Sequence, residues 1–239
     1  MNTKKRLVKI VTILVVMVYF SLISFAQKAT TNKDNKGKLL PFSEFKNTDI
    51  GAKTKVGTAT INKNKLIIVA GGSDIWGKQD EFHFTYKLIK GDFDMSVQVL
   101  NLSAVNQYTK AGIMARESLD DNSRHVYYQV FPDNSARNKN NGGCEFQYRT
   151  ETGGEMKAIY PDMQAVDKKC EVAYPNTWIR LKRKGDVFES YFSNDNKSWR
   201  CYSTFTLQMP IELMVGLAVT AHNSKANTTA GFASVRFRK

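Results

Sequence analysis

The sequence is poor in the side chains that metal sites and nucleophilic catalysis need. It contains three histidines and three cysteines among 239 residues, and neither Cys-x-x-Cys nor His-x-x-x-His spacing occurs. Structural zinc sites are built from such closely spaced pairs, and a catalytic cysteine needs a histidine to activate it. The sequence therefore predicts neither a zinc site nor a cysteine nucleophile.

Nucleic-acid-binding motifs are also lacking, although the chain is basic. The formal net charge is +13, and four basic residues lie within positions 4–9, so the rest of the chain carries about +9. Lys and Arg are spread over the sequence rather than gathered in one run, which is typical of a solvated surface. We predict no nucleic-acid partner.

No sustained helical period is visible, and the longest apolar run lies near the N-terminus. Basic residues at 4–9 precede an apolar stretch at 10–20, and Ser24-Phe25-Ala26 places small residues where a signal peptidase reads. We predict a signal peptide over 1–26 and export of the protein. The alternative is an uncleaved membrane anchor, because 7–26 has roughly the length that spans a bilayer.

The rest of the chain is predicted to be a lead-in followed by one domain. Residues 27–44 are predicted as disordered, because 27–38 has almost nothing to bury. Residues 45–239 suit a single all-β domain, since such sandwiches often reach about 200 residues. Export would permit a disulfide, and of Cys144, Cys170 and Cys201 we favour a bridge between the first two.

Alternating apolar and polar residues predict antiparallel strands throughout this domain. The clearest pattern covers 178–199, where Ile179 and Leu181 alternate with charged residues ahead of a Gly185-Asp186 turn. Further strands are predicted over 57–62, 65–70, 81–88, 93–100, 110–118, 125–131, 143–150, 199–207, 213–221 and 229–237. Many short strands without helices indicate an all-β sandwich or barrel.

Several blocks, taken in order, resemble one known family. They are GGSDIWG at 71–77 with DEFHF at 80–84, GDFD at 91–94, KAGIMARESL at 110–119, WIRL at 178–181, Ser193 with Asp195 and Trp199, and VGLAVT at 215–220. Together they resemble the DUF1349-type domain, a concanavalin A-like lectin/glucanase domain of secreted bacterial proteins. The resemblance implies a two-sheet antiparallel jelly-roll sandwich in a secreted, periplasmic or cell-envelope protein. It supplies no catalytic residues, because functions in the family are largely uncharacterised.

If the apolar residues face the core, the residues between them form a polar face. By this parity the face carries Tyr127 with Gln129, Glu145 with Gln147 and Arg149, Arg180 with Lys182, Glu189 with Tyr191, and Thr220 with His222. Sugar recognition needs flat apolar rings and planar hydrogen-bonding groups. We predict a carbohydrate site in which Tyr127 and Tyr191 stack on the sugar. Gln147, Arg149 and Arg180 would bind its hydroxyls, and a plain solvated face is the alternative.

Four more residues are candidates for the site. Arg116 ends a strand that is apolar on both faces, so it needs a carboxylate partner or an anionic ligand group. Trp76 lies in a Gly-rich loop and either contacts the ligand or closes the end of the core. Asp74 and Asp80 flank this Trp. We predict no cofactor, with calcium at these two carboxylates as the alternative to turn capping.

The predicted function is non-catalytic, lectin-like binding of a polysaccharide or glycan by a secreted protein. A polysaccharide hydrolase or lyase of the same fold is the first alternative, with Glu145 and Glu189 as its carboxylate pair. The Glu-x-Asp-x-x-Glu signature of many glucanases of this fold is absent, which argues against that type of enzyme. A structural or protein-interaction module of the cell envelope is the second alternative.

Overall fold

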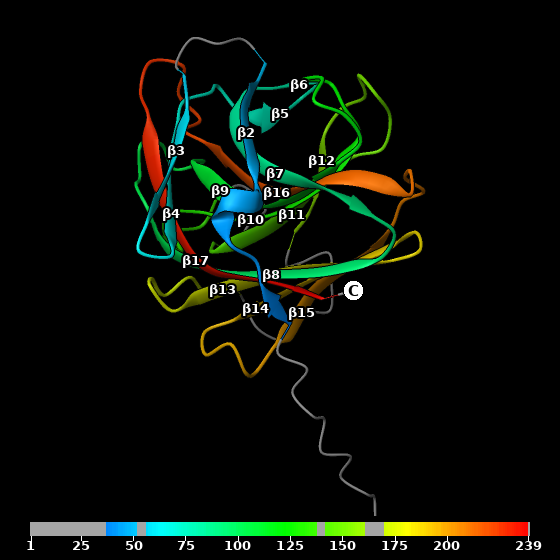
Figure 1. Cartoon of the computed structure of the whole chain (residues 1–239). Coiled ribbons are helices and arrows are strands. Elements are labelled where there is room, and N and C mark those ends of the chain that lie inside the picture. The colour runs from blue at the N-terminus through cyan, green and yellow to red at the C-terminus, as the bar shows by residue number, and fades with distance from the viewer. Residues whose placement is uncertain (1–36, 52–55, 138–141, 161–169, 239) are drawn as a thin grey trace, which may run out of the picture. The chain divides into compact units, whose positions relative to one another are not determined.

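The structure, a computed structural model, describes residues 37–51, 56–137, 142–160 and 170–238. The predicted signal peptide, 1–26, and most of the predicted lead-in lie outside these residues. The described ranges form two large antiparallel sheets, named sheet A and sheet B, that pack as layers (Figure 1). Within the same ranges, no helix is long and apolar enough to cross a membrane.

Sheet A has strands joined by short hairpins at both of its edges. Its strands lie in the order β15 (Arg200–Thr206), β14 (Val187–Ser193), β13 (Thr177–Lys184), β8 (Phe93–Leu102), β17 (Thr228–Arg238), β4 (Lys65–Ala70) and β3 (Thr58–Asn62), with β1 (Lys38–Leu39) paired to β17. The hairpins are β13–β14–β15 at one edge and β3–β4 at the other.

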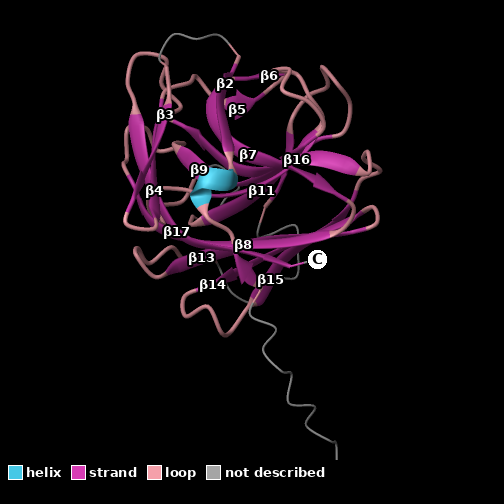
Figure 2. Cartoon of the chain, viewed as in Figure 1, coloured by secondary structure: helices cyan, strands magenta, loops and turns pink. Residues whose placement is uncertain are grey.

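Sheet B forms the second layer. Its strands lie in the order β12 (Lys157–Ile159), β11 (Cys144–Arg149), β10 (His125–Val130), β9 (Lys110–Arg116), β16 (Glu212–Thr220), β7 (Phe82–Lys90) and β2 (Lys46–Ile50). A small hairpin, β5 (Ile75–Trp76) with β6 (Gln79–Asp80), and a 3-10 turn, η1 (Phe42–Glu44), complete the regular structure of the described residues (Figure 2).

The main core lies between the sheets because each strand sends alternate side chains inward. In β13, Ile179 and Leu181 are fully buried, whereas Arg180 between them is partly exposed. In β10, Val126 and Tyr128 belong to the same core from the other layer. The predicted two-sheet antiparallel sandwich is confirmed.

Residues 38–44 are part of the sandwich and not of a disordered lead-in. Strand β1 pairs with β17, the Leu40 N–H donates to the Val235 carbonyl (3.0 Å), and Phe42 is buried in the core. The predicted boundary at residue 44 is therefore too late. A two-residue pairing and one buried ring leave no periodic signal in the sequence.

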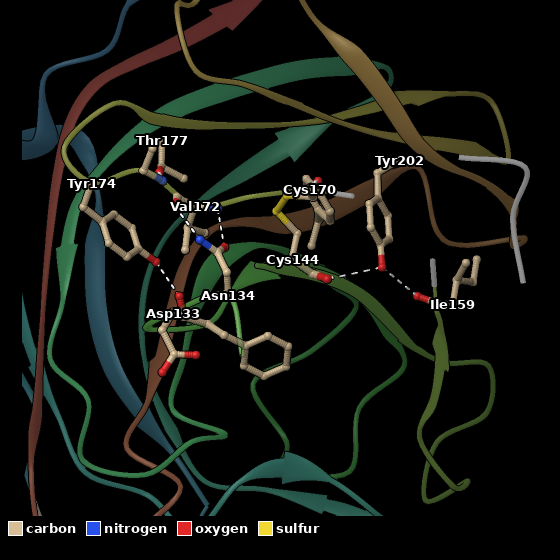
Figure 3. The surroundings of a disulfide bond; sticks show 12 residues. Asp133, Asn134, Cys144, Ile159, Cys170, Val172, Tyr174, Thr177 and Tyr202 are labelled. Atoms are coloured by element: carbon tan, nitrogen blue, oxygen red, sulfur yellow. Dashed lines mark hydrogen bonds between the residues drawn. A yellow bond between two sulfur atoms is a disulfide. The ribbon is translucent and has the colours of Figure 1, made fainter. Parts of the chain in front are cut away.

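Cys144 and Cys170 form a disulfide, which confirms the favoured pairing (Figure 3). Their Cα atoms are 5.6 Å apart, a usual separation for such a bridge. Beside it, the Asn134 amide accepts from the Val172 N–H (2.7 Å) and donates to the Val172 carbonyl (3.0 Å). The Tyr202 hydroxyl donates to the Cys144 carbonyl (3.3 Å). The chain after Cys170 is thus fixed to the start of β11.

Candidate functional site

The outer face of sheet B, on the side away from the core, carries buried polar side chains. Strand β11 sends Cys144 and Phe146 into the core, so Glu145, Gln147 and Arg149 point to the outer face. These three side chains are almost fully buried. An outward-facing polar residue is buried only when further chain covers the sheet, so this face is not a plain solvated surface.

A second apolar cluster covers the middle of the face. Ile75 of β5 and Met156, which precedes β12, pack there with Tyr127 of β10. Tyr127 has no exposed surface, and its hydroxyl donates to the Ala218 carbonyl (2.9 Å). Burial raises the pKa of this hydroxyl well above its usual value. Tyr127 therefore supports the fold and has no free ring face for the sugar that it was predicted to contact.

One end of the face holds a fully buried cluster of charges. Two guanidinium nitrogens of Arg149 lie 2.8 Å from the two carboxylate oxygens of Asp80. Arg116 and His125 lie 3.6 and 3.7 Å from the same carboxylate. Burial lowers the pKa of Arg116 to about 10 and that of His125 to about 4, although Asp80 opposes both shifts. His125 is therefore neutral at pH 7.

This cluster anchors the β5–β6 hairpin over sheet B. Arg149 also donates to the carbonyl of Gly77 at the hairpin turn (3.0 Å), which accepts from the Met156 N–H as well (2.9 Å). Asp80 is the last residue of β6. Arg149 and Arg116, both predicted to contact the ligand, are fully buried and bind Asp80 instead. The carboxylate partner that Arg116 requires is thus on the hairpin.

The other end of the face opens into a pocket of about 230 Å³. Its aromatic lining is Trp76 of β5, Tyr108 before β9 and Tyr160 after β12. Its polar lining is Asp74, Lys110, Arg137, Glu145, Gln147 and His222. Trp76 is 39% exposed, so its ring is accessible to a ligand.

Asp74 contacts Lys110 and His222 in the pocket wall. Its Oδ1 accepts from the Lys110 ammonium, and its Oδ2 is 3.2 Å from His222 Nε2. Burial opposes ionisation of Asp74, but Lys110 and His222 outweigh it, and the pKa of Asp74 is lowered. His222 has a φ of 51°, and its ring lies 5.3 Å from that of Tyr108.

Arg137 is held by contacts of its own. It pairs with Asp133, donates to the carbonyls of Gln107 (2.5 Å) and Ser135 (2.6 Å), and places its guanidinium 4.5 Å from the Phe131 ring centroid. The side chain is almost fully buried. It shapes the pocket wall, and its charge is matched by Asp133.

Of the predicted carbohydrate contacts, the structure places Trp76 and Gln147 at the pocket. Asp74 and Asp80, the carboxylates considered for calcium, each bind cationic side chains: Lys110 for the first and Arg149 for the second. Among the described residues, no group of three or more His, Cys, Asp or Glu side chains is arranged to hold a metal ion.

Arg180 and Tyr191 lie on sheet A and so do not share a face with the pocket residues. Strand β13 pairs with β8 and β14, both in sheet A. Arg180 Nε is 2.6 Å from Asp94 Oδ1, and its guanidinium stacks 5.3 Å from the Tyr191 ring centroid. The prediction of one shared polar face is wrong. Alternation shows which residues face outward but not from which sheet.

Glu145 and Glu189 cannot form a catalytic carboxylate pair. Glu145 faces outward from sheet B, and Glu189 faces outward from sheet A, where it accepts from Lys182 (2.8 Å). Packed sheets are about 10 Å apart, and these side chains point away from each other. Glycosidase carboxyls must lie about 5 Å or 6–10 Å apart. Their assignment as the hydrolase pair is wrong.

Sequence reasoning missed four pocket residues: Tyr108, Lys110, Arg137 and Tyr160. Lys110 begins a strand that is apolar on both faces, so the argument used for Arg116 would have found it. The two tyrosines and Arg137 lie outside the strands. No local pattern reveals what a loop residue faces.

The two packed antiparallel sheets form a jelly-roll sandwich of the concanavalin A-like kind. It is similar to a functionally unknown protein from Saccharomyces cerevisiae (TM-score 0.60, 13% identity, covering 83% of this chain and 98% of that one). It is also similar to the carbohydrate-binding module CBM66 from Bacillus subtilis (TM-score 0.51, 17% identity, 81% and 95%). A third similar structure is the GH43 protein BlXynB from Bacillus licheniformis (TM-score 0.52, 13% identity). The match covers 72% of this chain but only 32% of BlXynB.

The chain belongs to the family described as "Protein of unknown function (DUF1349)", whose model matches residues 55–239. No curated protein matches the sequence. At these identities the structural neighbours establish the fold alone.

Proposed function

We propose that this protein is a non-catalytic, lectin-like carbohydrate-binding protein whose ligand occupies the pocket beside Trp76. The proposal depends on the lining of this pocket, which combines aromatic rings with amide, carboxylate and cationic side chains. Sugars present apolar C–H faces and many hydroxyls, so such a lining can bind both. The similarity in fold to a carbohydrate-binding module supports the proposal.

The size of the pocket suits one part of a glycan. Pockets for drug-sized ligands have about 300–1,000 Å³, so about 230 Å³ accommodates a small portion of a polysaccharide. Asp74 does not suit the role of a glycosidase acid. A glycosidase acid needs a raised pKa, whereas Lys110 and His222 lower that of Asp74.

We also propose that the protein is exported. The residue pattern at 1–26 is that of a signal peptide. The Cys144–Cys170 disulfide is in keeping with an oxidising compartment. A polysaccharide-binding protein of the periplasm, cell envelope or medium would meet its ligand there. Fractionation of expressing bacterial cells tests this, since a protein that stays in the cytoplasm contradicts it.

Affinity electrophoresis in gels that contain soluble polysaccharides tests carbohydrate binding. We expect at least one polysaccharide to retard the full chain, and Trp76→Ala to weaken that binding about tenfold, as for a lost aromatic contact of ~1.4 kcal/mol. Trp199→Ala on the sheet A side is the matched control and should bind like the wild type. The proposal fails if glucans, xylans, mannans, galactans, fructans and polyuronates all leave the mobility unchanged.

A further inference from the structure

His222 differs from the other two histidines of the chain in presenting an accessible ring. Its side chain lines the pocket and is 30% exposed, whereas those of His83 and His125 are almost completely buried. In both buried histidines, Nε2 is enclosed without a hydrogen-bond partner among the described residues. The Nδ1 of His222 also has no partner among them, but it is not enclosed. This nitrogen is therefore open to a ligand.

The contact with Asp74 decides which ring nitrogen of His222 carries the hydrogen. Nε2 lies 3.2 Å from Asp74 Oδ2. Burial opposes ionisation of Asp74, yet its pKa is lowered, so the group is a carboxylate at neutral pH. A bare Nε2 would set its lone pair against that of the carboxylate oxygen, so Nε2 carries the hydrogen. In a neutral imidazole the other nitrogen, Nδ1, is then a hydrogen-bond acceptor.

The imidazole is held in place before any ligand arrives. Asp74 Oδ1 accepts from the Ile75 N–H (2.7 Å) and from the Lys110 ammonium, whose side chain is almost completely buried. Because Lys110 balances the charge of Asp74 from inside the wall, no positive charge on His222 is needed there. The Tyr108 ring packs against the imidazole, with 5.3 Å between the ring centroids. These contacts leave the edge of the ring that carries Nδ1 for a ligand.

We propose that His222 Nδ1 accepts a hydrogen bond from a hydroxyl of the sugar that occupies the pocket beside Trp76. A hydroxyl can donate this bond, whereas an ether or ester oxygen cannot. His222 therefore selects a sugar with a free hydroxyl at the contact position. The inference rests on the proposed function and adds to it a specificity-determining residue and the group that this residue recognises.

Long-range ¹H–¹⁵N nuclear magnetic resonance on the ligand-free full chain tests the state of the ring. The spectrum is recorded at about pH 8.5, where an imidazole is ordinarily neutral, and the signals of His222 are those that His222→Asn removes. We expect a protonated Nε2 and an unprotonated Nδ1. A hydrogen on Nδ1 would overturn the inference and leave the proposed function intact.

His222→Gln and His222→Asn form a matched pair of variants. The glutamine amide reaches the position of Nε2 and can keep the contact with Asp74, but it leaves no acceptor at the position of Nδ1. The asparagine amide lies at the position of Nδ1, and asparagine tolerates the φ of 51°. Melting temperatures show whether each variant is folded.

Affinity electrophoresis compares the two variants on glucans, xylans, mannans, galactans, fructans and polyuronates. On each polymer that retards the wild type, we expect His222→Gln to bind about tenfold more weakly and His222→Asn to stay within about threefold of the wild type. Wild-type binding by folded His222→Gln, or weaker binding by His222→Asn than by His222→Gln, would overturn the role of Nδ1. If no polymer retards the wild type, the proposed function itself fails.

Discussion

Arg149 and Asp80 form a bidentate ion pair, and both side chains are completely buried. Both nitrogen–oxygen distances are 2.8 Å, and the pair joins positions 69 residues apart. Asp80 ends the hairpin that carries Trp76, and Arg149 ends a strand of sheet B. The buried pair thus fixes the end of the hairpin, and with it the position of Trp76 in the pocket.

Replacing Arg149 should destabilise the whole domain. Arg149→Met leaves the buried Asp80 carboxylate without its main partner, and removing one member of a buried pair costs about 3–5 kcal/mol. Urea unfolding followed by tryptophan fluorescence measures this loss. Lys78→Met is the control: the Lys78–Glu155 pair is 3.9 Å long and exposed, and should contribute less than about 1 kcal/mol. Similar costs for both variants would contradict the anchoring role.

His125 should make stability depend on pH between about 4 and 6.5. Burial lowers its pKa in the folded protein to about 4, while the unfolded chain titrates near 6.5. The unfolded chain therefore binds more protons in this window. The stabilising effect is complete above pH 6.5 and is lost as the pH falls towards 4, on the order of 3 kcal/mol in all.

The measurement is the free energy of unfolding of the wild type and of His125→Gln at several pH values. We expect the difference between the two proteins to shrink as the pH falls from 7 to 4. A difference that stays constant over this range would show that His125 is not the titrating group. The neighbours Asp80, Arg116 and Arg149 remain in both proteins, which makes the comparison specific to the imidazole.

Reduction of the Cys144–Cys170 disulfide should lower stability by about 3–4 kcal/mol. The bridge closes a loop with a sequence separation of 26, and the chain-entropy relation for a loop of that length gives this magnitude. Thermal or urea unfolding with and without a reductant measures it. Cys201→Ser is the suitable background, because Cys201 is exposed and free to exchange. Equal stability in both conditions would contradict the prediction.

Arg180→Ala should leave carbohydrate binding unchanged. The side chain lies on sheet A, bound to Asp94 and stacked on Tyr191, on the opposite side of the core from the pocket. Because its pair with Asp94 is mostly buried, its loss should cost on the order of 1–3 kcal/mol of stability without altering the pocket. Affinity electrophoresis beside Trp76→Ala checks the location of the site. A binding defect in Arg180→Ala alone would move the site to sheet A.

The fold was accessible from the sequence because alternation is a local property. The range predicted at 110–118 contains β9, and that at 213–221 nearly coincides with β16. Strand β2, with the sequence KNTDI, was not predicted because it has little apolar alternation. The two-residue strands of the β5–β6 hairpin are too short to have a period at all.

The site was only partly accessible because it depends on contacts distant in sequence. Parity correctly placed Gln147 and Arg149 on an outward face. It could not show that the hairpin ending at Asp80 covers Arg149 and leaves Gln147 at a pocket. Nor could it assign Arg180 to the other sheet, since that follows from the pairing of β13 with β8, about 80 residues earlier.

The position of strand β17 in sheet A affects when the protein can fold during its synthesis. This strand is the last described strand in chain order, yet it lies inside sheet A between β8 and β4. Strands β8 and β4 each pair with β17. Until β17 emerges from the ribosome, nothing connects these two strands within sheet A. The sandwich can close only after Thr228–Arg238 has left the exit tunnel, so completion of the fold is a late event after translation of nearly the whole domain.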